Sequence, residues 1–153
     1  MQIFIITICN KKDDYTKALI DKYTLLIKKF YRINFINISF QTKKIKKNLY
    51  EEEYKKAVSL IKPDSFVIAL DENGVNFSSK IFSDKLKKLS EDYKNLYFII
   101  GGPDGLSEYV LNMSNMALSL SNLTFPHQIT KVILTEQIYR SICIMNNHPY
   151  HRS

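Results

Sequence analysis

Two thirds of the way along its length the chain reads Phe98-Ile99-Ile100-Gly101-Gly102-Pro103-Asp104-Gly105. The apolar residues at the start of this stretch predict a buried strand, and the glycines that follow predict a tight turn at its carboxyl end. The turn leads to a short helix, which we expect from Ser107. A buried strand that passes through a short turn into a helix is typical of α/β proteins.

Further apolar runs on both sides of this stretch also predict strands, and helical stretches separate them. We expect strands at Gln2–Thr7, Ile33–Ile38, Ser65–Leu70, Leu96–Ile100 and Met116–Leu120. We expect helices at Asp13–Phe30, Leu49–Ile61 and Ser78–Asp92, with Asp13 and Ser78 as N-caps, then a short helix from Ser107 and a long helix at Gln128–Met145. Continuous apolar strands separated by such helices predict an α/β fold, a mostly parallel sheet flanked by helices on both faces.

The length of 153 residues suits one domain with its own core, which we expect to span residues 1–153. No window approaches the roughly 18 apolar residues that a membrane span requires, and the apolar start of the chain has the length of a buried strand. The two cysteines, Cys9 and Cys143, lie far apart and outside any metal-binding spacing. These features indicate a reduced, cytoplasmic protein with no disulfide framework, no metal site and no membrane contact.

The net charge of +7 suits an anionic partner such as RNA, and it equally suits a solvated, lysine-rich surface. All of the excess positive charge precedes Gly101, because the residues from Gly101 onward include three basic and three acidic side chains. Against this lysine background the chain has three arginines, Arg32, Arg140 and Arg152. The guanidinium fork favours bidentate contacts with phosphate, and two of the three arginines lie in the C-terminal third.

Three connections follow the carboxyl ends of predicted strands, where open parallel sheets collect their ligands. They are the predicted turn Asp71–Gly74, the glycine turn Gly101–Gly105 and the segment Ser119–Pro126. The adjacent glycines of the second turn permit close approach of a flat ligand, although a tight turn without a ligand fits the same residues. Neither the dinucleotide fingerprint nor the phosphate-binding P-loop is present. This disfavours a nucleotide held by its phosphates and leaves open an adenosine held by backbone groups.

From Phe98 to the end, the chain carries four short motifs in sequence. They are Phe98–Ser107, Leu118-Ser119-Leu120-Ser121, Thr124-Phe125-Pro126-His127 and His148-Pro149-Tyr150-His151-Arg152. In order and spacing these motifs resemble the ribosomal RNA large subunit methyltransferase H family of the SPOUT class, and the likeness covers the whole length of the chain. The resemblance implies an α/β domain with a C-terminal trefoil knot that acts as a homodimer. It also implies methyl transfer from S-adenosylmethionine to N3 of a pseudouridine in 23S ribosomal RNA within assembled ribosomes, with no role for DNA.

By this resemblance the cofactor site is built from two strand ends and one loop. The implied cofactor-binding residues are Leu70, Gly101, Leu120, Ser121, Asn122, Leu123, Thr124 and Phe125. The implied catalytic residues on the tail are Tyr150, His151 and Arg152, which would complete the site of the partner protomer. Glu136 and Arg140 are four residues apart on the long helix and fit either a surface ion pair or an RNA-holding arginine with Glu136 orienting a neighbour. For His127, structural packing and contact with cofactor or RNA are both open.

The long helix carries more apolar residues than one face of a small domain needs. They are Ile129, Val132, Ile133, Ile138, Tyr139 and Ile142. This surplus predicts packing in a dimer, although an ordinary core stripe has a similar pattern. The alternative function is that of a non-catalytic ribosome- or RNA-binding protein of the same fold, which would have no reason to bind S-adenosylmethionine.

Overall fold

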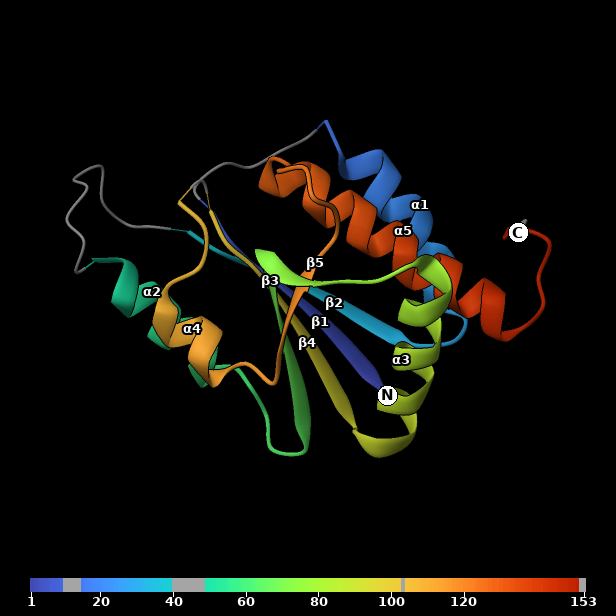
Figure 1. Cartoon of the computed structure of the whole chain (residues 1–153), viewed down its shortest axis with the longest axis horizontal. Helices are drawn as coiled ribbons and strands as arrows, with labels where there is room; N and C mark the ends of the chain where they lie inside the picture. Colours follow the sequence, from blue (N-terminus) through green and yellow to red (C-terminus); the bar gives the residue numbers. More distant parts are fainter. Residues whose placement is uncertain (10–14, 40–48, 103, 152–153) are drawn as a thin grey trace.

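The computed structural model describes residues 1–9, 15–39, 49–102 and 104–151, and its elements follow the predicted order (Figure 1). The strands are β1 (Gln2–Ile8), β2 (Arg32–Ile38), β3 (Ser65–Asn76), β4 (Asn95–Ile100) and β5 (Met116–Ser119). The helices are α1 (Lys17–Ile27), α2 (Leu49–Ser59), α3 (Ser79–Asp92), α4 (Glu108–Met113) and α5 (His127–Met145).

The five strands form one parallel sheet in the order β2-β1-β4-β3-β5. The predicted α/β fold with a mostly parallel sheet is therefore confirmed. Because every strand runs in the same direction, the loops that follow β1, β3, β4 and β5 begin at one edge of the sheet. This edge is where the predicted ligand-binding segments meet.

Two layers of helices cover the sheet, with α1, α3 and α5 on one face and α2 and α4 on the other (Figure 1). The alternation along β1 explains why both faces are apolar. Ile3 and Ile5 point to the face that α1, α3 and α5 cover, and Phe4 and Ile6 point to the face that α2 and α4 cover. Burial of each side chain of this size stabilises the folded state by about 1.5–3 kcal/mol, so β1, which is buried on both faces, contributes strongly to stability.

Two predicted helix starts are confirmed by their capping bonds. Ser78 Oγ accepts the amide of Ile81 at 3.2 Å, and Ser107 Oγ accepts the amide of Val110 at 3.4 Å. The first helix is shorter than predicted and begins at Lys17, after Thr16, which makes no side-chain capping bond. The predicted cap Asp13 lies outside the described residues.

The predicted turn at Asp71–Gly74 is wrong, because β3 continues through these residues to Asn76. The pairing of β3 with β5 jumps in register between Leu70 and Val75, so the intervening residues form an irregularity within a continuing strand. A Cβ added at Gly74 would lie 2.6 Å from the carbonyl carbon of Ala117. Glycine is therefore required at this position, where the backbone of β5 lies close beside that of β3.

The surplus of apolar residues on α5 divides between the core and the surface. Ile138, Tyr139 and Ile142 are buried in the chain's own core, as an ordinary core stripe would be, whereas Ile129 remains 42% exposed.

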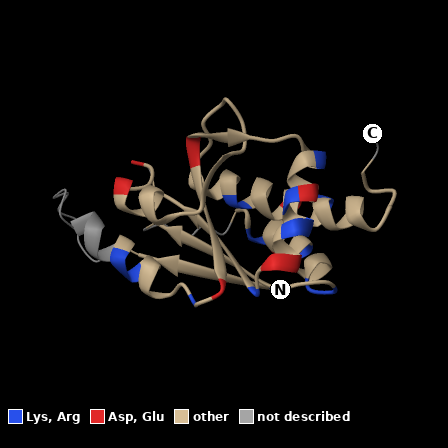
Figure 2. Ribbon diagram, turned by 60° about the horizontal axis from the view of Figure 1, so that its bottom comes forward, with Lys and Arg blue, Asp and Glu red and all other residues tan. Residues whose placement is uncertain are grey.

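Lys and Arg lie on the helices and turns at the outside of the molecule (Figure 2). Within the described part of the chain, no helix combines the length and the apolar character that a bilayer span requires.

Candidate active site

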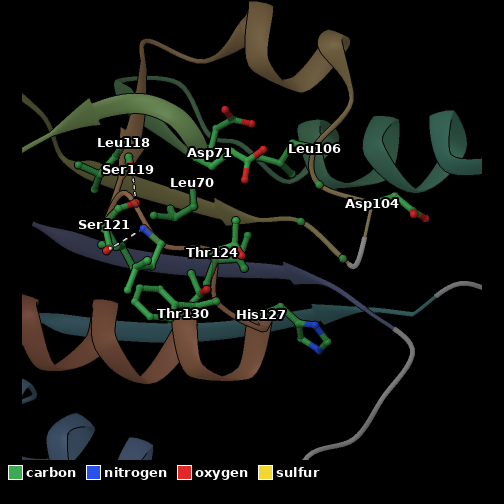
Figure 3. A pocket seen from close by; sticks show the side chains of 18 residues that line it. Leu70, Asp71, Asp104, Leu106, Leu118, Ser119, Ser121, Thr124, His127 and Thr130 are labelled. Carbon is green, nitrogen blue, oxygen red and sulfur yellow. Dashed lines mark hydrogen bonds between the residues drawn. The ribbon is translucent and has the colours of Figure 1, made fainter.

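A pocket of about 430 Å³ opens at the edge of the sheet where β4 and β5 end, beside Leu70–Glu72 of β3 (Figure 3). Its volume lies in the range of small-molecule sites, which is about 300–1,000 Å³. The described lining residues come from four parts of the chain. They are Leu70–Glu72, Ile100–Gly102 with Asp104–Leu106, Leu118–Ser121 with Leu123–Phe125, and His127 with Thr130. Because the described strand ends and loops supply most of this lining, backbone groups are well placed to contact a ligand.

The glycine turn after β4 forms one wall of the pocket. A Cβ added at Gly101 would lie 2.5 Å from the carbonyl carbon of Gly105, so the two backbone segments touch where a side chain would otherwise stand. Gly105 adopts φ +76°, a left-handed conformation that glycine tolerates without a steric cost. The hydroxyl of buried Tyr54 on α2 donates to the Gly105 carbonyl at 2.8 Å and holds the turn in place.

The segment after β5 forms the opposite wall and is held by its own serines. Ser119 Oγ donates to the Ser121 carbonyl at 2.8 Å, and Ser121 Oγ accepts the amide of Leu123 at 3.0 Å (Figure 3). These bonds fix the loop while Leu123 stays 71% exposed. Seven of the eight residues predicted for the cofactor site line the pocket, and Asn122 is exposed outside the lining.

Residues beyond the predicted set also line the pocket. Asp71 and Glu72 directly follow Leu70 on β3, and Asp104 lies in the glycine turn, so three acidic residues belong to the lining; Figure 3 labels Asp71 and Asp104. Their adjacency to predicted residues is the sequence signal that points to them. Within the described ranges, His, Cys, Asp and Glu side chains nowhere gather in threes that could hold a metal ion.

His127 joins the pocket to the end of β1. It begins α5 and lines the pocket, and its Nε2 lies 2.6 Å from the Sγ of buried Cys9. Thr130 lies about one turn further along α5 and lines the same wall. The contact with Cys9 supports the packing role for His127, and its place in the lining supports contact with a ligand.

A second polar cluster lies midway along α5, where the tail folds back on the helix. The Nε of Arg140 donates to Glu136 Oε1 at 2.9 Å, and the hydroxyl of Tyr150 donates to the same oxygen at 3.0 Å. The guanidinium carbon of Arg140 lies 5.0 Å from the centre of the Tyr150 ring, a cation–π distance. Glu136 and Arg140 therefore form an ion pair with Tyr150 as a third member; we call these three residues the tail cluster.

Protonation in the tail cluster follows from its contacts. The hydrogen bonds with Glu136 raise the pKa of Arg140, so its charge is permanent at any working pH. Burial, together with the neighbouring Glu136 carboxylate, raises the pKa of the Tyr150 phenol, which therefore remains a donor. The Nδ1 of His151 is buried and has no hydrogen-bond partner among the described residues, while Arg152 lies outside them.

Within one chain the tail cluster and the pocket are separate. Glu136 lies six residues after Thr130, the last described lining residue on α5, which corresponds to about 9 Å at 1.5 Å per residue. The structure thus brings seven of the eight predicted cofactor residues together around one pocket, and it brings Arg140 and Tyr150 together at Glu136. It does not bring the two groups to each other within a single chain.

The sequence as a whole matches one family model. The model described as "Predicted SPOUT methyltransferase" matches residues 1–151. The chain belongs to the SPOUT methyltransferase family. Both the pocket and the tail cluster lie within the matched residues.

Curated relatives of this SPOUT methyltransferase match it from end to end. Proteins named ribosomal RNA large subunit methyltransferase H from Clostridium botulinum (strain Kyoto / Type A2) and Clostridium tetani are each 38% identical to it over 159 aligned positions. The protein of that name from Clostridium acetobutylicum is 36% identical. Each alignment covers 99% of this chain and 100% of the relative.

A solved structure supports the fold of the SPOUT methyltransferase. It is described as a probable methylase family protein from Haemophilus influenzae Rd KW20, and it superposes with a TM-score of 0.54 at 13% identity. The match covers 99% of this chain and 70% of the other. At this identity the likeness bears on the fold alone.

Proposed function

We propose that this SPOUT methyltransferase transfers a methyl group from S-adenosylmethionine to N3 of a pseudouridine in 23S ribosomal RNA within assembled ribosomes, in the cytoplasm. The observation that carries the proposal is the pocket whose walls are the Gly101–Gly105 turn and the Leu118–Phe125 segment. Relatives named ribosomal RNA large subunit methyltransferase H, aligned along their full length, support the choice of RNA.

The pocket fits the adenosyl part of S-adenosylmethionine. Gly101 and Gly105 line the pocket with backbone alone, and Leu70 and Leu118 supply apolar surface. Backbone groups of the Leu120–Phe125 loop are positioned to hold the adenine and ribose. When bound, S-adenosylmethionine supplies a methyl group on a positively charged sulfonium, and the carboxylates of Asp71, Glu72 and Asp104 make the surroundings compatible with that charge.

The proposed active unit is a homodimer in which each tail completes the pocket of the other subunit. The separation of about 9 Å along α5 supports this arrangement, because one chain alone does not place its tail cluster at its own pocket. The half-exposed Leu19 and Ile129 supply apolar surface on α1 and α5. The proposal includes the C-terminal trefoil knot implied by the family resemblance. A monomeric mass in sedimentation at micromolar concentration would contradict the dimer.

In the proposed reaction the N3–C bond forms, the bond from sulfur to the methyl carbon breaks, and the N3 proton leaves. We assign His151 as the group that accepts or shares this proton, because an imidazole nitrogen is a suitable proton acceptor. Tyr150 and Glu136 orient the tail. Arg140 and Arg152 are assigned to RNA, because a guanidinium pairs with phosphate or a base carbonyl. Positioning of the reacting nitrogen accounts for much of the expected rate enhancement.

The decisive experiment is a labelled methyl-transfer assay on intact ribosomes, isolated subunits and naked RNA, with the modified base identified by mass spectrometry. We expect label at N3 of a pseudouridine and the highest rate on intact ribosomes. Transfer to another base or another RNA would refute the proposed substrate. Calorimetry with S-adenosylmethionine separates the enzyme from a non-catalytic RNA-binding protein, which would give no binding heat.

A further inference from the structure

We infer that Tyr23, on α1, is a positioning residue that fixes the C-terminal tail against α5. Its hydroxyl oxygen lies 3.3 Å from the hydroxyl oxygen of Tyr150. Its ring packs against that of Tyr139, with centroids 5.9 Å apart. The two tyrosines in hydroxyl contact are 127 positions apart in the chain, so the contact is a product of the fold.

Tyr23 adds a contact from a second helix to a tail residue otherwise held by α5. The Tyr150 ring meets Tyr139 edge-on at a centroid distance of 4.9 Å, and Arg140 lies over its face. Glu136, Tyr139 and Arg140 all lie on α5, whereas Tyr23 lies on the neighbouring α1. Contacts from two helices restrict rotation of the Tyr150 side chain more than contacts from one helix.

The direction of the hydrogen bonds follows from proton counting. An ionised carboxylate accepts only, so the single hydroxyl proton of Tyr150 is used in its bond to Glu136. In the contact between the two hydroxyls, Tyr23 must then be the donor. The resulting chain runs from Tyr23 to Tyr150 to Glu136, which also accepts from Arg140. Phenylalanine at position 23 keeps the ring and removes this donor.

The chain of bonds also reaches the backbone of the tail. The amide of Tyr150 donates to Nδ1 of His148 at 3.2 Å, and the amide of His148 donates to the Cys143 carbonyl at 2.9 Å. Orienting Tyr150 therefore orients the next residue, His151. The catalytic meaning of this contact rests on the proposed function, in which the tail completes an active site.

The test is Tyr23→Phe, with Tyr109→Phe on α4 as the matched control. Hydrogen exchange of the peptide that holds residues 146–151 is measured by mass spectrometry. Loss of one hydrogen bond from the tail should raise its exchange rate about two- to fivefold, and the control should leave it unchanged. In a Tyr150→Phe background, Tyr23→Phe should have no further effect, since the shared bond is already absent. Unchanged exchange in Tyr23→Phe, with circular dichroism showing a folded protein, would overturn the inference.

The kinetic constants of methyl transfer distinguish a loss of tail positioning from a general loss of folded enzyme. We expect kcat for methyl transfer to fall by a similar factor, with KM for S-adenosylmethionine unchanged, because the pocket is remote from Tyr23 in the same chain. Faster tail exchange with an unchanged kcat would overturn the positioning role. The exchange measurement requires no turnover, so it decides the tail contact even if methyl transfer to pseudouridine fails.

Discussion

Replacing Gly101 with alanine should damage both the fold and the pocket. The new Cβ would lie 2.5 Å from the Gly105 carbonyl carbon, 2.6 Å from its oxygen and 2.9 Å from the Leu106 nitrogen. Normal carbon contacts begin near about 3.5 Å, so the turn must shift by roughly 1 Å. Because all three atoms belong to the backbone, no side-chain rotation relieves the contact. Overpacking of this kind costs about 1–3 kcal/mol, which lowers Tm by about 2–12 °C in a protein of this size.

The assay pairs thermal unfolding with calorimetry of S-adenosylmethionine. Because the displaced turn lines the pocket, we expect Gly101→Ala to weaken cofactor binding about tenfold, or ~1.4 kcal/mol. Wild-type Tm and affinity in this variant would refute the steric reasoning.

Gly105 provides the matched control, because its constraint is conformational. A Cβ there has no heavy atom within 4 Å, but φ is +76°. Alanine in that conformation costs about 1–2 kcal/mol, and asparagine tolerates it better. At position 105 we therefore expect asparagine to be more stable than alanine. At position 101 we expect the opposite order, with the asparagine variant less stable than the alanine variant, because the larger side chain clashes more. The same order of stability at both positions would contradict the steric reasoning at Gly101 and the conformational reasoning at Gly105.

Three further predictions concern the tail and its cluster. His151→Ala, or removal of residues 150–153, should abolish methyl transfer and leave S-adenosylmethionine binding near normal in calorimetry; undiminished turnover would remove the tail from the mechanism. Glu136→Gln should lower stability by about 1–2 kcal/mol, since charge-assisted bonds from Arg140 and Tyr150 lose their ionised acceptor. An unchanged Tm in that variant would mean that the bonds contribute nothing. Burial raises the pKa of Tyr150, so its contact is fully present below the unfolded value of about 10 and is lost as pH rises through the higher folded-state value. In an absorbance titration of tyrosinate at alkaline pH, Tyr150→Phe should remove one late-titrating group, and an identical curve would count against the assignment.

Local signals predicted the elements of the fold well, because each depends on neighbouring residues. Apolar runs located the strands, and Ser78 and Ser107 located two helix starts. The turn predicted at Asp71–Gly74 failed for a non-local reason. Its polar residues and glycine have turn character, but β5 supplies hydrogen-bond partners at Val75 and Asn76 that keep β3 extended. No sequence window near β3 contains that information.

The same difference between local signals and non-local contacts applies to the candidate site. Many of the pocket residues could be predicted because they follow the carboxyl ends of β4 and β5, which meet at one edge of a parallel sheet. Leu70 was predicted at a strand end, but it lies within β3 beside this edge. The tail contacts could not, since Tyr23 and Tyr150 meet only through the packing of α1 against α5. The ion pair of Glu136 and Arg140 was open to two interpretations, and its third member Tyr150 links it to the tail.

The strand order has a consequence for biosynthesis. β1 is made first, yet its second neighbour is β4, with Gln2 beside Asn95. A nascent chain that has not yet reached Asn95 leaves one edge of β1 without its native hydrogen-bond partner and its isoleucines incompletely covered, conditions that favour aggregation. Translation must therefore reach Asn95 before the centre of the sheet can close.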